Sequence, residues 1–189
     1  KNIKRCVALS TDKASSPINL YGATKLVSDK LFVAGNAYSG EHKACFSVVR
    51  YGNVMGSRGS VIPFFNQIKE SGTIPITDIE MTRFMISLEE GVELVWRAFD
   101  DMVGGEIYVK KIPSMKVTEV ASTVAPDAAH EIIGIRPGEK LHEQMIGEED
   151  AASTYEYEDH YKILPIINPG LNFYVSSYYY TSDKLYENN

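Results

Sequence analysis

Hydrophobic and polar residues alternate in long blocks along the first third of the chain. An apolar run at 6–10 has the character of a buried parallel strand, and a second run at 44–51 repeats it. Between them, apolar positions recur at helical spacing until the pattern ends near Gly40. The positions on this helical stripe are Leu20, Thr24, Val27, Leu31 and Ala34. The order strand, helix, strand predicts a right-handed parallel unit.

Beyond Gly56 the predicted elements become shorter. They are a helix at 61–69, a strand at 74–76, a helix at 87–102 with Ser87 as its N-cap, a strand at 106–109, a helix at 116–125, a strand at 132–135, and a helix after the turn at 136–140. The chain from 156 onward is rich in tyrosine, and we expect the end around 178–180 to be loose.

These patterns predict an α/β fold in two parts. Residues 1–60 form the carboxyl-terminal half of a Rossmann-like domain, a partial parallel sheet made of that domain's later strands. Residues 61–189 form mainly a small α/β substrate-binding lobe, with some Rossmann-like elements and the loose end. Because ligands of such sheets bind beyond the carboxyl ends of the strands, 10–13 and 50–53 are expected to share one crevice.

Composition narrows the function classes. The net charge of -6 and the pI near 5.3 come without clustered Lys and Arg, which argues against a nucleic-acid partner. No apolar run approaches the ~18 residues of a membrane span, and the start lacks the apolar stretch of a signal peptide. Cys6 and Cys45 lie in apolar runs, which predicts buried thiols in a cytoplasmic protein. The four histidines lack metal-ligand spacing, so no metal site is predicted.

A tyrosine and a lysine four residues apart carry the most informative chemistry. Tyr21 and Lys25 share one face of the predicted helix, so the Lys25 ammonium can lower the pKa of the Tyr21 phenol and let it act as a base. This pattern is typical of enzymes that use a nicotinamide cofactor. The turn G-x-G-x-x-G, which holds the cofactor diphosphate after a first strand, does not occur in the sequence. We therefore expect half of the cofactor site to be missing.

Six short motifs together resemble the extended short-chain dehydrogenases/reductases. They are S-T-D-K at 10–13, Y-G-A-T-K at 21–25, R-Y-G-N at 50–53, G-S-R-G-S-V-I-P at 56–63, M-T-R-F at 81–84 and R-P-G-E-K at 136–140. More narrowly, the chain resembles the inverting UDP-N-acetylglucosamine 4,6-dehydratases that open pseudaminic acid biosynthesis and serve flagellin or surface-glycan synthesis. The similarity runs from residue 1 to roughly 175.

The resemblance implies several properties of a complete enzyme. They are NADP as cofactor, UDP-N-acetylglucosamine as substrate and, for the full-length subunit, a homo-oligomer. Family members begin with a dinucleotide fingerprint and about 100 residues of βα units, which this chain lacks before Lys1. The chain is therefore expected to be a carboxyl-terminal fragment that is inactive alone, or else a part of a subunit that is completed by another chain.

The resemblance assigns catalytic roles to Asp12, Lys13, Tyr21 and Lys25. Tyr21, assisted by Lys25, takes the C4 hydroxyl proton as hydride leaves for NADP. A protonated Asp12 gives a proton to the leaving C6 hydroxyl, and a neutral Lys13 takes the C5 proton. Both states lie away from the usual pKa values of about 3.9 and 10.4, and adjacency alone favours the charged pair, so burial has to supply the shifts. The competing interpretation of Asp12 and Lys13 is a solvated turn pair.

The resemblance also implies binding residues. On the cofactor side they are Ser10, Tyr21, Lys25 and Tyr51. On the substrate side they are Thr11, Asn53, Val61, Thr77, Arg83, Arg136 and Glu139. Arg83 and Arg136 would clamp the diphosphate, for which planar guanidinium groups are suited, or would pair instead with Glu80 or Glu139. Thr77 would follow a short strand that pairs with uracil through backbone groups, or would be an ordinary edge-strand residue.

Three functions compete at this stage. The leading one is C5-inverting dehydration to UDP-2-acetamido-2,6-dideoxy-β-L-arabino-hex-4-ulose. Nucleotide-sugar 4-epimerases and retaining 4,6-dehydratases share Y-x-x-x-K, but retaining dehydratases usually place Glu after the Asp, so Lys13 favours inversion. The third is a non-catalytic fragment that binds only a UDP-sugar or a partner subunit.

Overall fold

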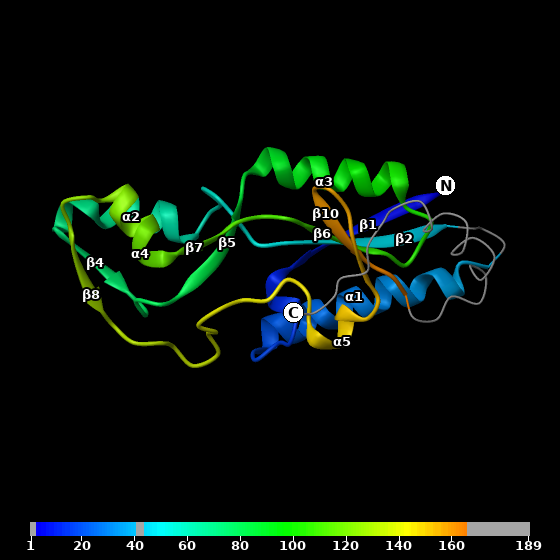
Figure 1. The fold of residues 1–189 in the computed structure, drawn as a ribbon, viewed down its shortest axis with the longest axis horizontal. Helices are drawn as coiled ribbons and strands as arrows, with labels where there is room; N and C mark the ends of the chain where they lie inside the picture. The colour runs from blue at the N-terminus through cyan, green and yellow to red at the C-terminus, as the bar shows by residue number, and fades with distance from the viewer. Residues whose placement is uncertain (1–2, 41–43, 166–189) are drawn as a thin grey trace.

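A five-stranded sheet forms the larger part of the molecule, which a computed structural model describes over residues 3–40 and 44–165 (Figure 1). In spatial order its strands are β1 (Arg5–Thr11), β2 (Cys45–Tyr51), β6 (Ile107–Lys110), β10 (His160–Ile163) and β9 (Thr154–Glu156). The first three run parallel, whereas β10 pairs antiparallel with both β6 and β9. The predicted α/β fold with a partial parallel sheet is confirmed, and two antiparallel strands extend the sheet.

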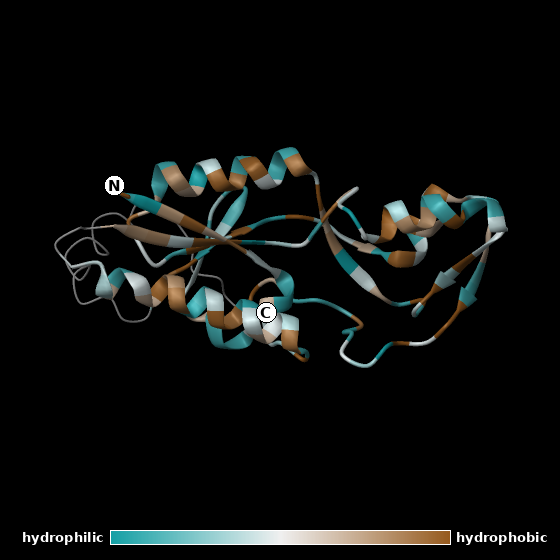
Figure 2. Ribbon diagram, turned by 180° about the vertical axis from the view of Figure 1, so that it is seen from behind, coloured by the Kyte–Doolittle hydropathy of each residue, from teal (hydrophilic) through white to brown (hydrophobic). Residues whose placement is uncertain are grey.

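Two long helices cover opposite faces of this sheet, α1 (Leu20–Tyr38) and α3 (Leu88–Asp101) (Figure 1). Successive residues of a strand point to opposite faces, so Val48 packs in one core with Ile107, and Val49 packs in another with Leu94 of α3. Figure 2 shows the hydrophobic colouring of the strands between the two helices. Burial on both faces explains why these strands read as continuous apolar runs.

The predicted start of α3 is confirmed in detail. Ser87 Oγ accepts a hydrogen bond from the Glu90 backbone N–H at 3.1 Å, and the Glu90 carboxylate accepts one from the Ser87 N–H at 2.9 Å. This reciprocal pair satisfies backbone donors that the first helical turn leaves open.

The predicted helix after Leu20 exists as α1, yet its apolar stripe faces outward. Leu20, Val27 and Leu31 are 81%, 57% and 66% exposed. The side that packs on the sheet instead carries buried Asp29 and half-buried Phe32, whose ring meets Phe46 edge-on with centroids 6.1 Å apart. The spacing of the stripe thus predicted a helix correctly but did not identify the face that packs.

A smaller lobe lies beyond the carboxyl ends of β1 and β2 (Figure 1). Its elements are β3 (Asn53–Val54), α2 (Val61–Ile68), the 3₁₀ turn Lys69–Ser71, β4 (Thr73–Ile76), β5 (Thr82–Ile86), β7 (Ser114–Lys116), α4 (Val117–Val124) and β8 (Ala129–Ile132). β4 pairs parallel with β8, and β5 pairs antiparallel with β7. Phe65 of α2, Ile74 and Ile76 of β4, and Val120 of α4 meet in its buried core.

Two predictions about the region after residue 128 are wrong. The strand expected at 132–135 is β8, which lies three residues earlier, because pairing with β4 fixes its position. The helix expected after 136–140 does not form, and the short α5 (Glu148–Ala151) is the one helix between residues 141 and 165. Carbonyl groups at Lys140 and Leu141 accept hydrogen bonds from Arg83 instead of from helical N–H groups.

Other expectations meet the structure only in part. Cys6 and Cys45 are half-buried rather than buried, and neither forms a disulfide in the described part of the chain. Strands β6, β9 and β10, all after residue 60, belong to the main sheet. The domain boundary at 60 stays a prediction, and the tyrosine-rich end at 178–180 lies outside the described residues. Over the described ranges, no helix has the length and apolar character to cross a membrane, and no cluster of side chains is arranged to hold a metal ion.

A buried histidine at the start of β10 makes stability depend on pH. Burial lowers the pKa of His160 below its ordinary 6.5, although the Asp159 carboxylate, 2.8 Å from Nδ1, partly opposes this. The ring stacks on Tyr157 with centroids 4.8 Å apart. Burial acts to raise the pKa of Asp159, but hydrogen bonds from His160 and Lys110 and the charge of Arg97 bring it to about 2.

We expect the free energy of unfolding to fall as pH drops from 7 to 5. The unfolded state takes up a proton at His160 below 6.5 while the folded state resists it, so this stability is present above 6.5 and is lost at lower pH. The contribution of Asp159 is constant over this range, because it is lost only between 3.8 and about 2. Urea unfolding of the chain and of His160→Phe at both pH values checks this. An equal pH dependence in the two proteins would show that His160 does not carry it.

Candidate active site

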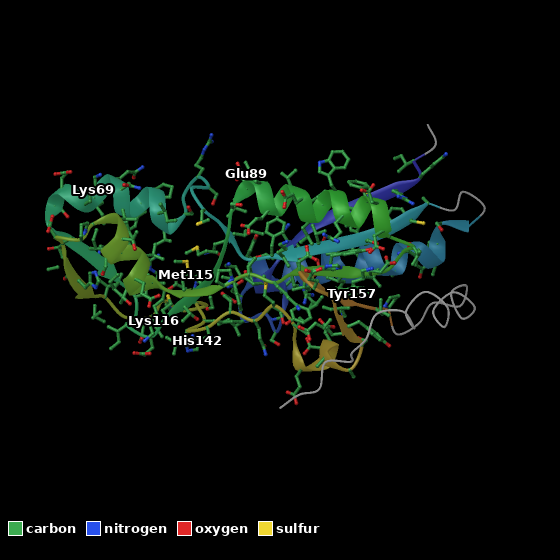
Figure 3. The ribbon with its side chains drawn as sticks, turned by 45° about the horizontal axis from the view of Figure 1, so that its top comes forward. Lys69, Glu89, Met115, Lys116, His142 and Tyr157 are labelled. Carbon is green, nitrogen blue, oxygen red and sulfur yellow. The ribbon has the colours of Figure 1, made fainter. Side chains whose placement is uncertain are left out.

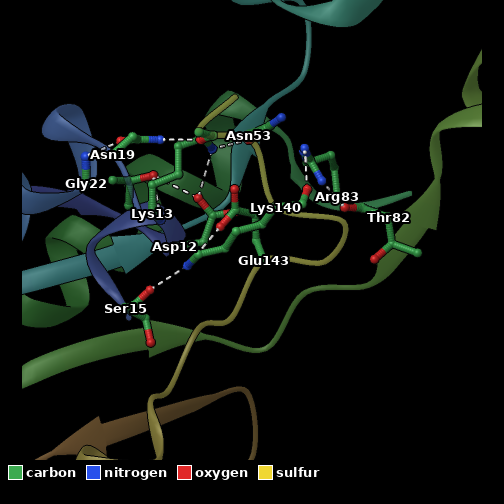
Figure 4. Close-up of polar contacts among 12 residues, drawn as sticks. Asp12, Lys13, Ser15, Asn19, Gly22, Asn53, Thr82, Arg83, Lys140 and Glu143 are labelled. Carbon is green, nitrogen blue, oxygen red and sulfur yellow. Dashed lines mark hydrogen bonds and ion pairs between the residues drawn. The ribbon is translucent and has the colours of Figure 1, made fainter. Parts of the chain in front are cut away.

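A short 3₁₀ turn, Asp12–Ala14, follows β1 and carries the predicted acid and base; we call it the Asp12 turn. The Asp12 side chain is fully buried, and its Oδ1 accepts hydrogen bonds from Thr11 Oγ1 at 2.8 Å and from Lys13 Nζ at 3.0 Å. Lys13 Nζ also donates to Asn53 Oδ1 at 3.1 Å (Figure 4). The ends of β1 and β2 therefore meet as predicted, and the burial of Asp12 rules out a solvated turn pair.

Two glycines allow other parts of the chain to approach this turn closely. A Cβ on Gly22 would lie 2.3 Å from the Lys13 carbonyl oxygen, so the first turn of α1 packs directly against the Asp12 turn. A Cβ on Gly52 would lie 2.4 Å from the Phe84 carbonyl oxygen, where the chain leaves β2 and passes β5. Asn19 caps α1 by accepting a hydrogen bond from the Gly22 N–H at 2.8 Å.

The predicted tyrosine and lysine lie at the open start of α1. Tyr21 is 53% exposed, and Lys25 Nζ donates to the Leu9 carbonyl at 3.2 Å. Burial raises the pKa of Tyr51, and the charge of the Tyr21 phenolate raises it further. Leu9, on the edge strand β1, is 52% exposed. The phenol of Tyr21 and the ammonium of Lys25 therefore lie beside an open surface.

A buried ionic cluster lies beside the site, on the side of α1 that faces the sheet. Arg50 of β2 bonds Asp29 of α1 at 3.2 Å, Asp150 of α5 at 3.3 Å and the Met145 carbonyl at 2.9 Å. Ser10, predicted to contact the cofactor, donates from Oγ to Asp29 at 2.8 Å. Burial raises the pKa of Asp29, which the Ser10 hydrogen bond and the Arg50 charge oppose. Arg50 is therefore an anchor between three elements, β2, α1 and α5.

A cavity of about 460 Å³ adjoins the Asp12 turn at Asn53. Its volume suits a ligand of nucleotide size. Residues that line it and were predicted to bind substrate are Asn53, Val61, Thr77, Arg83, Arg136 and Glu139. Thr11, the remaining predicted substrate residue, is buried, and its hydroxyl donates a hydrogen bond to Asp12.

The sequence analysis did not single out several residues of this cavity. They include Gly59, Ser60, Phe64, Gln67, Pro75 and Ile133. Phe64 lies three positions after Val61 on α2, so helical spacing from a predicted contact could have identified it. Ile133, in contrast, reaches the cavity through the pairing of β4 with β8, which local sequence does not reveal.

The two predicted phosphate ligands differ in their surroundings. Arg83 Nη1 donates to the carbonyls of Thr82 at 2.7 Å and Leu141 at 3.2 Å, and Nη2 donates to that of Lys140 at 3.0 Å. A guanidinium has five N–H groups, so these bonds leave Arg83 some capacity for a ligand. Arg136 is 67% exposed and lies 3.9 Å from Glu139. The alternative pairing of Arg83 with Glu80 does not occur within the described residues, because Glu80 bonds Lys116 at 3.0 Å.

Known proteins share this sequence over most of its length. UDP-N-acetylglucosamine 4,6-dehydratase (inverting) of Campylobacter jejuni is 59% identical over 167 residues, which cover 87% of this chain and 50% of that protein. UDP-glucose 4-epimerase of Rickettsia conorii is 40% identical over 176 residues, covering 90% of this chain and 51% of that protein. The chain thus spans about half the length of the curated relatives it matches. The resemblance to inverting dehydratases that the motifs indicated is confirmed.

Solved structures share the fold. Pen from Bacillus thuringiensis superimposes with a TM-score of 0.82 at 36% identity, over 87% of this chain and 54% of that chain. Structures at 20% identity or less, among them complexes with NAD and with NADPH, share the fold alone. The family described as polysaccharide biosynthesis protein matches residues 1–165. The chain therefore belongs to the polysaccharide biosynthesis protein family.

Proposed function

We propose that this chain carries the acid–base and sugar-binding part of a UDP-N-acetylglucosamine 4,6-dehydratase that inverts C5. The observation that carries the proposal is the position of Lys13, which bonds both buried Asp12 and cavity-lining Asn53. An acid and a base are thereby joined at the edge of a cavity large enough for a UDP-sugar. The 59% identity with an inverting dehydratase supports the same assignment.

The ion pair of Asp12 and Lys13 supplies both proton carriers at once. Dehydration needs an acid for the leaving C6 hydroxyl and a base for the C5 proton. Transfer of one proton along the 3.0 Å hydrogen bond from Lys13 Nζ to Asp12 Oδ1 produces a neutral acid and a neutral amine together. A substrate that closes the cavity removes water from the pair and favours this neutral form.

The other residues complete the proposed reaction. Tyr21 takes the C4 hydroxyl proton, and Lys25 orients the cofactor ribose and supports the phenolate. Tyr21, Lys25, Ser10 and Tyr51 would hold NADP, which would supply the hydride acceptor for C4 and the hydride donor for C6. Lys13 takes the C5 proton and Asp12 protonates the departing C6 hydroxyl, so that water leaves. A proton returned to C5 from the opposite face gives the L-arabino product. NADP rather than NAD is part of this proposal.

The cavity supplies groups suited to a UDP-sugar. Pro75, Phe64 and Ile133 give apolar surface suited to a base. Arg136 and Arg83 also line the cavity, and their planar guanidinium groups suit bidentate hydrogen bonds to a diphosphate, so we propose that they bind it. The proposal extends to a homo-oligomer, supported by the exposed apolar stripe of α1, and to a cytoplasmic location, supported by cysteines without a disulfide.

A 4-epimerase is the second candidate, because the Rickettsia relative is 40% identical over a similar stretch. An epimerase returns hydride to C4 and needs no proton transfer at C5 or C6. The two proposals therefore differ in whether Lys13 and Asp12 exchange protons with C5 and the C6 hydroxyl of the sugar.

Lys13→Glu is expected to abolish inversion at C5 while oxidation at C4 continues. The substitution replaces an amine base by a carboxylate beside Asp12, the arrangement of retaining dehydratases. The complete enzyme, NADP and UDP-N-acetylglucosamine are combined in heavy water, and proton NMR follows deuterium at C5 and the ring couplings. Lys69→Glu, on the exposed end of α2, is the matched charge change. If the wild-type enzyme forms a simple C4 epimer, the dehydratase proposal is refuted. If Lys13→Glu still forms the L-configured product, Lys13 takes no part in the reaction.

A further inference from the structure

An irregular stretch of chain, residues 136–143, joins the cavity to the Asp12 turn; we call it the bridging segment. Arg136 and Glu139 at its start line the cavity. The Gly138 carbonyl accepts a hydrogen bond at 2.8 Å from Asn19 Nδ2, whose other amide atom caps α1. The segment therefore contacts both the ligand space and the helix that carries Tyr21.

The far side of the bridging segment is tied to the cavity lobe. Thr82 of β5 donates from its N–H to the Leu141 carbonyl at 3.1 Å, and its hydroxyl lies 2.8 Å from His142 Nδ1. Figure 3 shows His142 near Lys116, which pairs with Thr82 across β5 and β7. With Arg83 bonding the Lys140 carbonyl as well, the backbone of this segment has a fixed position.

The Lys140 side chain crosses from this segment to the Asp12 turn. Its Nζ donates to the Ser15 carbonyl at 2.7 Å and lies 3.4 Å from Glu143 Oε2 (Figure 4). The side chains of Lys140 and Glu143 are only 15% and 6% exposed. Ser15 is the residue that ends the turn, since its N–H donates to the Asp12 carbonyl at 3.1 Å.

The burial of Ser15 gives this contact its importance. Ser15 is 1% exposed, so a carbonyl that lost the ammonium donor would be buried without its partner unless the turn moved. Hydrogen bonds from charged donors are stronger than neutral ones, and a low local dielectric strengthens them further. The end of the turn is thus held by a group 125 residues away in the sequence.

We propose that Lys140 is a positioning residue for the catalytic pair. It holds Asp12 and Lys13 at a fixed place relative to the bound sugar, while Arg136 and Glu139 bind the nucleotide part of the same ligand. This inference rests on the proposed function. Lys140 touches neither the reacting atoms nor the cofactor in this role. It fixes the distance between the ligand clamp and the proton carriers, and misplacement of reacting groups by about 1 Å is enough to cost on the order of 100-fold in rate.

The test compares Lys140→Met with Lys111→Met in the complete enzyme. Lys111 is also half-buried and pairs with Glu156 at 2.6 Å, but it contacts neither the turn nor the bridging segment. We expect Lys140→Met to lower kcat at least about 10-fold while KM for UDP-N-acetylglucosamine and Kd for UDP change less than about 3-fold. Lys111→Met should change none of them. If Lys140→Met fails to fold, Lys140→Gln is used instead, with the same expected changes in kcat, KM and Kd.

Hydrogen–deuterium exchange of the peptide spanning 11–16 provides a readout that needs no turnover. The Ser15 N–H bond to Asp12 should open more often without Lys140, so exchange of this peptide should be at least about 10-fold faster than in Lys111→Met. Unchanged exchange overturns the inference whether or not the wild type turns over. A wild type without dehydratase activity overturns the proposed function alone. Unchanged kcat in a folded Lys140→Met, or equal loss of UDP binding, also overturns the positioning role.

Discussion

Replacement of Tyr21 by phenylalanine is expected to lower turnover of the complete enzyme at least about 100-fold, the usual effect of losing a positioned acid or base. The change removes only the phenolic oxygen. Tyr21 is 53% exposed at the start of α1, so little packing depends on that oxygen, and UDP binding should change little. The measurement is single-turnover formation of reduced cofactor, together with UDP affinity by calorimetry.

Tyr38→Phe is the matched control for this prediction. Tyr38 lies at the other end of α1 and is 87% exposed, so the same atom is removed without contact with the site. Its turnover should equal that of the wild type. A Tyr21→Phe enzyme that keeps near-normal turnover would take Tyr21 out of the mechanism.

Arg50→Met is expected to lower the free energy of unfolding by about 3–5 kcal/mol, the typical cost of breaking a buried ion pair from one side. Arg50 is 1% exposed and bonds two carboxylates, Asp29 and Asp150. Without the guanidinium these groups remain in a site where burial already raises the pKa of Asp29. Urea denaturation of this chain, followed by circular dichroism, measures the loss.

Two further variants separate charge loss from packing loss at Arg50. Arg97→Met removes a guanidinium that pairs with Asp159 at 3.0 Å but is 48% exposed, so its effect should stay below about 1 kcal/mol. Adding Asp29→Leu to Arg50→Met removes one unpaired carboxylate and should restore part of the lost stability. If the double variant is no more stable than Arg50→Met, the loss comes from packing rather than from buried charge.

Sequence patterns predicted the elements whose signals are local and strong. α1 and α3 have long periodic runs, β2 has a continuous apolar run, and the Ser87 cap follows from hydrogen bonds within four residues. β5 and β7 were missed because each is short and depends on distant backbone partners: β7 pairs with β5, and β5 pairs with both β7 and β3. The same reason explains why β9 and β10 had no clear signal in the tyrosine-rich region.

The motifs predicted which residues belong to the site but not the contacts that those residues make. The motifs named Asn53, Arg83 and Arg136 as ligand groups, and these side chains line one cavity. They did not reveal that the two terminal nitrogens of Arg50 bond buried partners, or that Lys140 reaches Ser15. Such contacts depend on the folded positions of segments about 100 residues apart, for which a single sequence carries no local pattern.

The path of the chain between the sheet and the cavity lobe limits how the molecule can move. The chain leaves the sheet at Gly52, returns after β5, leaves again after β6 and comes back through the bridging segment. The outgoing and returning stretches are cross-linked where β5 pairs with β7. A wide swing about a single hinge would have to bend all of them together. Access for a ligand is therefore expected to come from small sliding displacements of packed elements, with the two lobes otherwise moving as one stiff body.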